Sequence, residues 1–361
     1  MSWLWIPIAF VAALLAAAAA TPLASRLSLA LGVVDRPNER KVSARANIPR
    51  WGGLAVALGT FVGIGVALLI APTDESFQQT LEALLVGALL VLGVGAMDDR
   101  WALAAWPKLA VEIIAAGIAF AVGLRIEHVT DPITGTVWYF APWLSWLLTT
   151  AWIVVVTNSL NLIDGLDGLC TGVSAIIGAA LTLLAWQGGH LPGLMIGVPL
   201  VGALLGFLPF NFPPARIFVG DTGALFIGYC LSLLALESYQ RVTVVTFLVP
   251  LLALAVPLLD TSLSILRRLR RRTNVMLADR EHIHHRLLRD FDGSHRPAVL
   301  SLYFLTACFC LIAISFTRLH GLAVIVFLAI VFLLTYRILK NLGLIAAPPP
   351  PASADAERET P

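Results

Sequence analysis

Apolar runs long enough to cross a membrane recur along the whole of this 361-residue chain. A helix needs about 20 residues to cross about 30 Å of hydrocarbon, because each residue adds about 1.5 Å. The runs lie at residues 3–24, 51–71, 80–97, 107–124, 142–160, 169–186, 193–209, 222–238, 244–264, 298–316 and 321–339. The sequence therefore predicts an all-α, polytopic membrane protein with about 11 transmembrane helices.

The composition agrees with a chain embedded in lipid. Hydrophobic residues make up 58% of the chain and charged residues 13%, whereas soluble domains average about 45–50% and about 25%. The formal net charge is only +2, which is too small a basic surplus for a nucleic-acid binder, so no nucleic-acid partner is expected. The partner that this composition does predict is the lipid bilayer.

The distribution of Lys and Arg predicts an orientation. With the N-terminus outside, the inner segments hold 21 of the 24 Lys and Arg residues. Cytoplasmic loops carry the excess of these residues, so we expect the N-terminus outside and the C-terminus in the cytoplasm. Residues 1–345 would form a single membrane domain and residues 346–361 a disordered tail. The outer connection 125–141 predicts a small hairpin or an interfacial loop.

Carboxylates are costly inside a membrane, at about 2.5–3.5 kcal/mol for an Asp at a helix centre, so their positions are informative. Under the expected orientation, seven Asp residues map to the inner ends of spans or to inner loops. They are Asp35, Asp98, Asp99, Asp164, Asp167, Asp221 and Asp260. This pattern predicts an acidic ring that faces the cytoplasm.

Two acidic motifs stand at the ends of predicted spans. Asp98 and Asp99 close the third span, where adjacent carboxylates suit a base or a metal ligand and an ordinary polar helix end is the alternative. Asp221 lies in Gly-Asp-Thr-Gly before an apolar run, where helix capping is the alternative to a functional role. Nearby Arg216 is either a phosphate clamp or a residue placed by topology alone.

A third motif repeats polar side chains at steps of three. Asn158, Asn161, Asp164 and Asp167 have this spacing, which would align them on one face of a helix. A turn between two spans is the alternative. The matched spacing beside two glycines favours a functional role, because glycine allows a backbone to approach a phosphate closely.

Basic and imidazole side chains occupy two inner loops. His284, His285 and Arg286 lie in the largest of these loops. They suit a polyanion better than a transition metal, because no cysteine or third ligand at metal spacing accompanies them. Lys41 lies in the segment DRPNERK, which would form a lid over a phosphate or bind anionic lipid. A solvated basic loop is the alternative for the His-containing segment.

The motifs together indicate phosphoryl transfer at the membrane surface. Carboxylates and amides without thiols select a hard cation, and Mg²⁺ takes one or two carboxylates plus substrate phosphates. Displacement at phosphorus needs alignment and charge neutralisation, which a metal, Arg, Lys and His supply. The sequence therefore predicts a diphosphate substrate, with a lipid as the second partner.

The chain resembles the polyprenyl-phosphate N-acetylhexosamine-1-phosphate transferase family, and most of all its bacterial branch that transfers N-acetylglucosamine 1-phosphate to undecaprenyl phosphate. The resemblance lies in the segments DRPNERK, PRWGG, DDR, NSLNLIDGLDGL, PARIFVGDTGAL and HIHHR. The resemblance covers residues from about 30 to about 290. It implies transfer of a sugar 1-phosphate from a UDP-N-acetylhexosamine to undecaprenyl phosphate, with release of UMP. It further implies Mg²⁺ or Mn²⁺ as cofactor and an active site on the cytoplasmic face of the bacterial inner membrane.

The resemblance also implies roles for individual residues. Asp98 would be the general base, Asp99 its acidic partner and Asp221 the metal-binding aspartate of the catalytic group. Asp164 and Asp167 would be further metal ligands. The implied substrate-binding residues are Lys41, Asn158, Asn161, Asp164, Asp167, Arg216, His284, His285 and Arg286. Arg286 stands where relatives that handle a muramyl peptide usually carry a third His, which argues against that branch.

Three alternatives stay open from the sequence. A transporter or lipid flippase would also be polytopic, but transporters place charged groups near the bilayer midplane. Here Glu112 is the main charge inside a predicted span. An inactive scaffold is the second alternative, and a muramyl-peptide transferase is the third. The choice of hexosamine, the envelope polymer served and the oligomeric state, a homodimer included, stay open as well.

Overall fold

The computed structural model describes residues 3–35, 47–71, 75–130, 136–239, 244–270, 283–291 and 293–316, together with positions 326, 329, 330, 333 and 337. The chain divides into two compact units, Met1–Arg318 and Leu319–Pro361. The helices and strands named below all belong to the first unit.

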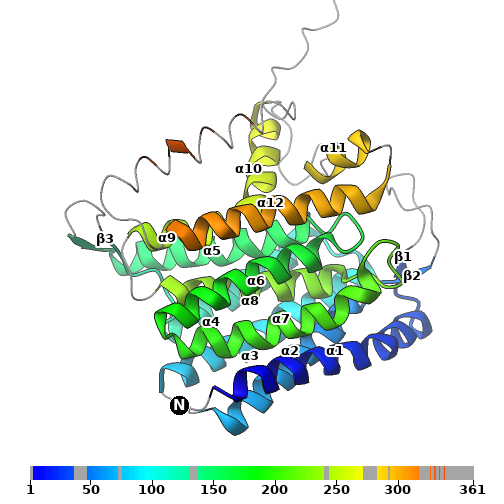
Figure 1. Cartoon of the computed structure of the whole chain (residues 1–361), viewed down its shortest axis with the longest axis horizontal. Helices are drawn as coiled ribbons and strands as arrows, with labels where there is room; N and C mark the ends of the chain where they lie inside the picture. Colours follow the sequence, from blue (N-terminus) through cyan, green and yellow to red (C-terminus); the bar gives the residue numbers. More distant parts are fainter. Residues whose placement is uncertain are drawn as a thin grey trace, which may run out of the picture. The chain divides into compact units, whose positions relative to one another are not determined.

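The first unit is a bundle of helices (Figure 1). Its principal members are α1 Trp5–Ala30, α2 Gly52–Ile70, α3 Glu75–Trp101, α4 Ala105–Ala121, α5 Pro142–Leu162, α6 Leu169–Gly188, α7 Leu191–Asn211, α8 Gly220–Tyr239 and α12 His295–Phe316. Seven helices within the described residues are long and apolar enough to cross a membrane. The predicted polytopic helical membrane protein is thus confirmed, while a count of about 11 spans stays a prediction.

The expected span 244–264 is not one continuous helix. The chain forms α9 Val244–Ala253 and α10 Ala255–Arg270, with a break at Leu254, and α10 runs in a different direction from its neighbours (Figure 1). Pro257 explains the break, because proline has no N–H and its ring clashes with the carbonyl four residues earlier, here that of Ala253. The expected run 321–339 falls almost entirely outside the described residues.

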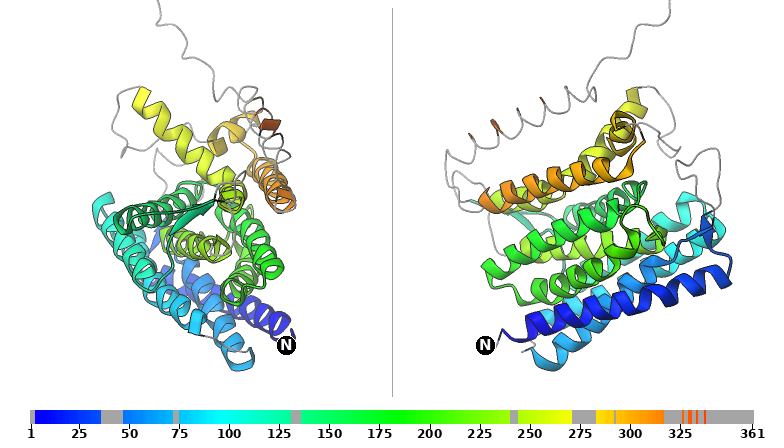
Figure 2. Two further views of the ribbon diagram at one scale, coloured as in Figure 1. Left: turned by 90° about the vertical axis from the view of Figure 1, so that its left-hand side faces the viewer. Right: turned by 45° about the vertical axis from the view of Figure 1, so that its right-hand side comes forward.

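α8 is the central helix of the bundle. Every residue from Thr222 to Glu237 is buried, because α2, α3, α5, α6 and α7 all pack against it. Figure 2 shows these neighbours around it. A helix that is apolar all round needs such an environment, and the arrangement places the polar N-terminus of α8 among the ends of several other helices.

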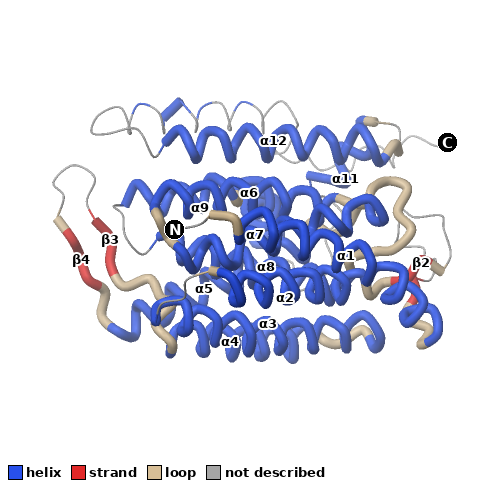
Figure 3. The backbone as a smooth tube through the Cα atoms, turned by 60° about the horizontal axis from the view of Figure 1, so that its bottom comes forward, coloured by secondary structure: helices blue, strands red, loops and turns tan. Residues whose placement is uncertain are grey.

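Two short antiparallel pairs lie at opposite ends of the bundle (Figure 3). β3 His128–Thr130 pairs with β4 Val137–Tyr139, so the described residues of the connection 125–141 include an antiparallel strand pair, as the hairpin prediction requires. β1 Val34–Asp35 pairs with β2 Ile48–Pro49 and ties the end of α1 to the start of α2. The short helix α11 Ile283–Asp290 precedes α12. We call the end that carries β1 and β2 the polar end of the bundle.

Candidate active site

Asp98 and Asp99 lie in the last turn of α3, which continues to Trp101. Consecutive residues of a helix point about 100° apart, because there are about 3.6 residues per turn. The two carboxylates therefore have different partners. Asp98 Oδ1 accepts a hydrogen bond from Leu103 N at 2.6 Å, in the turn toward α4, whereas Asp99 faces the start of α8.

Asp99 caps the N-terminus of α8. Its Oδ1 accepts from Asp221 N at 3.1 Å, and its Oδ2 accepts from Thr222 N at 3.0 Å and from Thr222 Oγ1 at 2.6 Å. The first N–H groups of a helix have no partner within the helix, and a carboxylate there also complements the helix dipole. Asp99 therefore fixes the position of Asp221 through these hydrogen bonds.

Lys108, in the first turns of α4, links two of the predicted carboxylates. Its Nζ lies 2.7 Å from Asp98 Oδ2 and 3.1 Å from Asp221 Oδ2. All three side chains are at most 21% exposed, so their charges are screened less than those of surface pairs. Sequence reasoning did not assign this lysine to the site.

Arg50 is a second cation that the predicted site set omitted, although PRWGG contains it. Its Nη2 lies 3.1 Å from Asp99 Oδ1 and 3.6 Å from Asp221 Oδ1. Its backbone N–H donates to Ser28 Oγ at 3.1 Å, which holds it beside the end of α1. Arg50 thus adds a positive charge on the side of Asp221 away from Lys108.

The two glycines after Arg50 allow α2 to approach α8. Gly52 N donates to Phe218 O at 3.0 Å, and Gly53 N donates to Val219 O at 2.9 Å. A Cβ on Gly53 would lie 2.1 Å from Gly223 N, closer than any real side chain permits. Glycine at this position is therefore required by the packing of two helix N-termini at the site.

The predicted stripe of polar residues is only half helical. α5 ends at Leu162, so Asn158 and Asn161 lie on the helix, while Asp164 and Asp167 lie in the turn before α6. Asn161 Nδ2 is 3.4 Å from Asp221 Oδ2. Asn158 lies one turn deeper and donates to Glu112 Oε2 of α4.

The two carboxylates of this turn have different surroundings. Burial raises the pKa of Asp164 well above its usual range, and the negative charges of Asp221 and Asp99 raise it further. A cation beside Asp164 would favour its ionised form. Asp167 Oδ2 accepts from Ala215 N at 2.9 Å, so its carboxylate holds the loop that leads to α8.

Five other predicted residues are not among the described members of this cluster. Arg216 is exposed, and its backbone N–H donates to Phe210 O at 2.8 Å. Lys41 lies outside the described residues. His284, His285 and Arg286 belong to α11, but their side chains also lie outside what the structure describes. Their roles stay predictions.

The donor atoms of the site suit a hard divalent cation. Asp98 Oδ2 and Asp221 Oδ2 already converge on one positive charge, the ammonium of Lys108. Within the described residues, no three His, Cys, Asp or Glu side chains are placed to hold a metal ion. Mg²⁺ commonly takes only one or two carboxylates and completes its shell with water and substrate phosphates, so the residues fit Mg²⁺ bound together with a phosphorylated substrate.

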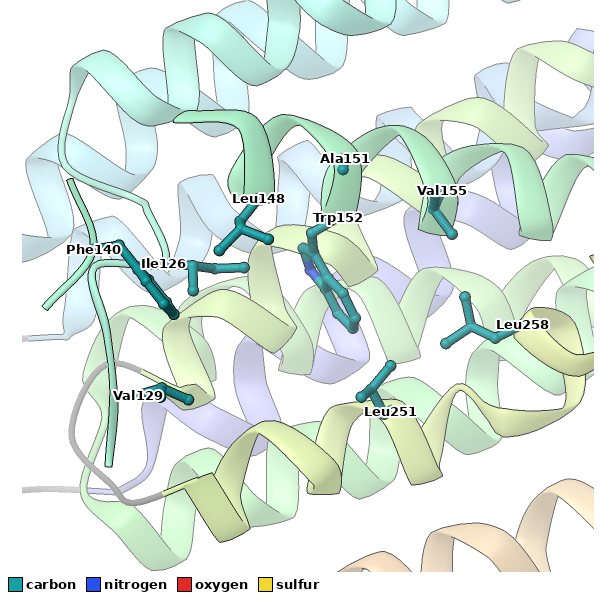
Figure 4. Close-up of a pocket in the computed structure, with 9 residues that line it drawn as sticks. All are labelled: Ile126, Val129, Phe140, Leu148, Ala151, Trp152, Val155, Leu251 and Leu258. Carbon is teal, nitrogen blue, oxygen red and sulfur yellow. The ribbon is translucent and has the colours of Figure 1, made fainter. Parts of the chain in front are cut away.

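An apolar cavity of about 370 Å³ lies beside α5. Its lining comes from α5, α9, α10, strand β3 and the residues that flank the β3–β4 pair, and Figure 4 shows Trp152, Val155 and Leu258 pointing toward it. Val155 is one turn before Asn158 on α5. The cavity therefore offers an apolar surface along the same helix that carries Asn158 and Asn161.

Comparison with known proteins adds independent information. Residues 81–239 match the model of glycosyl transferase family 4. A Bacillus subtilis (strain 168) protein named "Probable undecaprenyl-phosphate N-acetylglucosaminyl 1-phosphate transferase" is 36% identical over 310 residues, which cover 86% of this chain and 84% of that protein. The decaprenyl-phosphate N-acetylglucosaminephosphotransferase of Mycobacterium tuberculosis (strain CDC 1551 / Oshkosh) is 36% identical over 305 residues, or 78% of this chain and 74% of that protein.

A relative from another branch matches a shorter stretch. The phospho-N-acetylmuramoyl-pentapeptide-transferase of Shouchella clausii (strain KSM-K16) is 34% identical over 202 residues, which cover 53% of this chain and 61% of that protein. The N-acetylglucosamine phosphotransferases therefore share more of this chain's length than this muramyl-peptide enzyme does.

Proposed function

This chain belongs to glycosyl transferase family 4, and on that premise we propose that it transfers N-acetylglucosamine 1-phosphate from UDP-N-acetylglucosamine to undecaprenyl phosphate, releasing UMP. One observation carries the proposal: Asp98, Asp99 and Asp221 converge at the polar end between two cations, Lys108 and Arg50. Clustered carboxylates that can share a cation with a diphosphate suit this reaction class.

We infer that the polar end faces the cytoplasm of a bacterial inner membrane. The distribution of 21 of the 24 Lys and Arg residues on one side supports this orientation, because such residues accumulate in cytoplasmic loops. In this proposal the N-terminus is outside and the C-terminus inside, and the predicted run 321–339 would be the last of about 11 spans. A UDP-sugar from the cytoplasm would reach the site directly.

The acceptor in this proposal is a lipid phosphate. The apolar cavity beside α5, at about 370 Å³, supports a place for part of a polyprenyl chain, since apolar chains favour pockets without polar lining. Val155 borders the cavity, and Asn158 follows one turn later. A chain lying there would have its phosphate toward the polar end.

The reaction would be a single displacement. Asp98 orients or deprotonates the lipid phosphate, whose oxygen attacks the phosphorus bonded to the sugar, and UMP leaves. A bound Mg²⁺ or Mn²⁺ would supply charge neutralisation on the diphosphate. Asp221 would hold that cation with Asp164, Asp99 fixes Asp221, and Lys108 and Arg50 balance the carboxylates. His284, His285 and Arg286 would hold the diphosphate, and Lys41 would cover it.

Transport is the alternative from another class. A transporter would place ionisable groups and broken helices near the bilayer midplane. Here Asp98, Asp99 and Asp221 lie at helix ends. This placement supports chemistry at a membrane surface over passage through the membrane.

The direct test is release of UMP from UDP-N-acetylglucosamine and undecaprenyl phosphate by the full chain in detergent. We expect release that requires Mg²⁺ or Mn²⁺ and that is lost in Asp98→Asn and Asp221→Asn, with expression unchanged. Near-native turnover in either variant would reject the assignment of that residue. A trapped phosphoryl-enzyme would instead identify Asp98 as a nucleophile. A panel of UDP-sugars in the same assay identifies the hexosamine.

A further inference from the structure

Glu112 is a buried carboxylate that the proposed reaction does not use. It lies in the middle of α4, 1% exposed, and one helical turn from Lys108. A carboxylate at such a position is costly unless a polar group satisfies it. It accepts a hydrogen bond from the amide of Asn158 on α5, which lies outside the cluster of Asp98, Asp99 and Asp221.

The side-chain amide of Asn158 is held in one orientation. Its Nδ2 donates both to Glu112 Oε2 and to Val154 O, the latter at 2.9 Å. Turning the amide over would set Oδ1 against these two oxygen atoms, because an amide oxygen only accepts hydrogen bonds. Among the residues that the structure describes, no donor reaches Asn158 Oδ1.

We propose that Glu112 is a positioning residue, which fixes Asn158 so that its Oδ1 accepts a hydrogen bond from an N–H or O–H group of the UDP-sugar. The inference rests on the proposed function. Asn158 lies one turn along α5 from Asn161, whose amide is 3.4 Å from Asp221 Oδ2. Residues three apart on a helix are neighbours, with Cβ atoms about 5–6 Å apart, so Oδ1 is within reach of a substrate held at Asp221.

The orientation selects the chemistry of the group that is bound. Fully ionised phosphates offer acceptors only, so an amide that presents its oxygen does not bind them. The UDP-sugar has suitable donors in two places, the uridine, with its ring N–H and ribose hydroxyls, and the sugar, with its hydroxyls and acetamido N–H. Asn158 would therefore contribute to recognition of the uridine or the sugar, whereas Lys108 and Arg50 would balance negative charge at the site.

The first test removes the acceptor that holds the amide. In Glu112→Leu we expect the KM for UDP-N-acetylglucosamine to rise about tenfold, with kcat nearly unchanged, because binding that is equal in ground and transition states affects KM. UDP-glucose, which lacks the acetamido N–H, and UMP as an inhibitor separate the two sources. Loss of preference for N-acetylglucosamine indicates the sugar, and weaker inhibition by UMP indicates the uridine.

The second test reverses donor and acceptor in the pair. Asn158→Asp places two carboxylates face to face and should raise KM about tenfold or more. Adding Glu112→Gln restores a hydrogen bond, with Gln as donor and Asp as acceptor. The double variant should therefore have a KM at least about threefold lower than that of Asn158→Asp alone. The swap keeps both side chains close to native size, so it remains informative if Glu112→Leu does not fold.

Glu237→Gln is the matched control. Glu237 is another buried carboxylate, it accepts a hydrogen bond from Thr80, and it lies sixteen residues, about 24 Å, along α8 from Asp221. Its KM should be native. An unchanged KM in folded Glu112→Leu, or a double variant no better than Asn158→Asp, would overturn the positioning role. Absence of UMP release by the native protein would instead contradict the proposed function.

Discussion

Thr222, at the start of α8, donates two hydrogen bonds to the same carboxylate oxygen of Asp99, at the end of α3: its N–H at 3.0 Å and its hydroxyl at 2.6 Å. The two residues are 123 positions apart in the chain. A carboxylate from α3 thus accepts the hydrogen bonds that a capping residue within the chain of α8 itself commonly accepts. Because Asp221 directly precedes Thr222, any change in this contact moves Asp221.

Asp98→Asn and Asp99→Asn should separate chemistry from positioning. Asp99→Asn turns an acceptor of three hydrogen bonds into a group with an N–H₂ facing donors, and we expect a loss of about 1–2 kcal/mol in stability together with reduced activity. Asp98→Asn should lose activity with stability close to native. Thermal unfolding midpoints in detergent, measured beside turnover, provide the comparison. Equal midpoints for the two variants would contradict the capping role.

Lys108→Met should affect both turnover and cation binding. Without its ammonium, Asp98 and Asp221 repel each other, so turnover should fall about 100-fold while Mn²⁺ binds more tightly in the absence of substrate. Electron paramagnetic resonance titration of Mn²⁺ measures that affinity directly. Arg125→Met is the control, because Arg125 forms an exposed pair with Glu127 that should contribute little. Weaker Mn²⁺ binding in Lys108→Met would argue against competition between the ammonium and the cation.

The acidic part of the site could be predicted from the sequence because membrane spans tolerate few carboxylates. Asp98, Asp99 and Asp221 each end or begin an apolar run, so the expected orientation of the spans predicts that they lie at one end of the bundle. The different roles of these three carboxylates could not be predicted, since they depend on how the end of α3 packs against the start of α8. Whether Asp99 caps α8 is decided by tertiary packing, which no local pattern encodes.

Lys108 shows the opposite case. In the sequence, Lys108 is one more positive charge in an expected inner segment, and a lysine at the start of a span is ordinary by that criterion. One signal is present in the sequence: Lys108 follows Asp98 and Asp99 by only ten and nine residues, across the short connection between two predicted spans, so the chain reversal there brings it back toward the pair. Pro257 is likewise a recognisable helix breaker, but the continuous hydropathy of residues 244–264 favours one unbroken span and so does not predict the break.

Gly53→Ala should be far more damaging than Gly65→Ala in the same helix. A Cβ on Gly53 would lie 2.1 Å from Gly223 N, whereas a Cβ on Gly65 would meet nothing within 4 Å. The first change must push the start of α2 away from the start of α8, so we expect activity to fall with the unfolding midpoint. The second should be neutral or stabilise by about 0.5–1 kcal/mol. A stable, active Gly53→Ala protein would show that the contact is not needed at the site.

Metal removal should separate Asp221 from Asp167, both of which the family resemblance implies to be metal ligands. Treatment with EDTA should abolish UMP release, and added Mg²⁺ or Mn²⁺ should restore it. Asp221→Asn should then show little recovery at any cation concentration, because it loses a carboxylate oxygen that the site directs at a cation. Asp167→Asn should need the same Mg²⁺ concentration for half-maximal activity as the native protein, since Asp167 Oδ2 accepts from Ala215 N, and it should instead lower the unfolding midpoint. A large increase in that Mg²⁺ concentration would return Asp167 to the set of metal ligands.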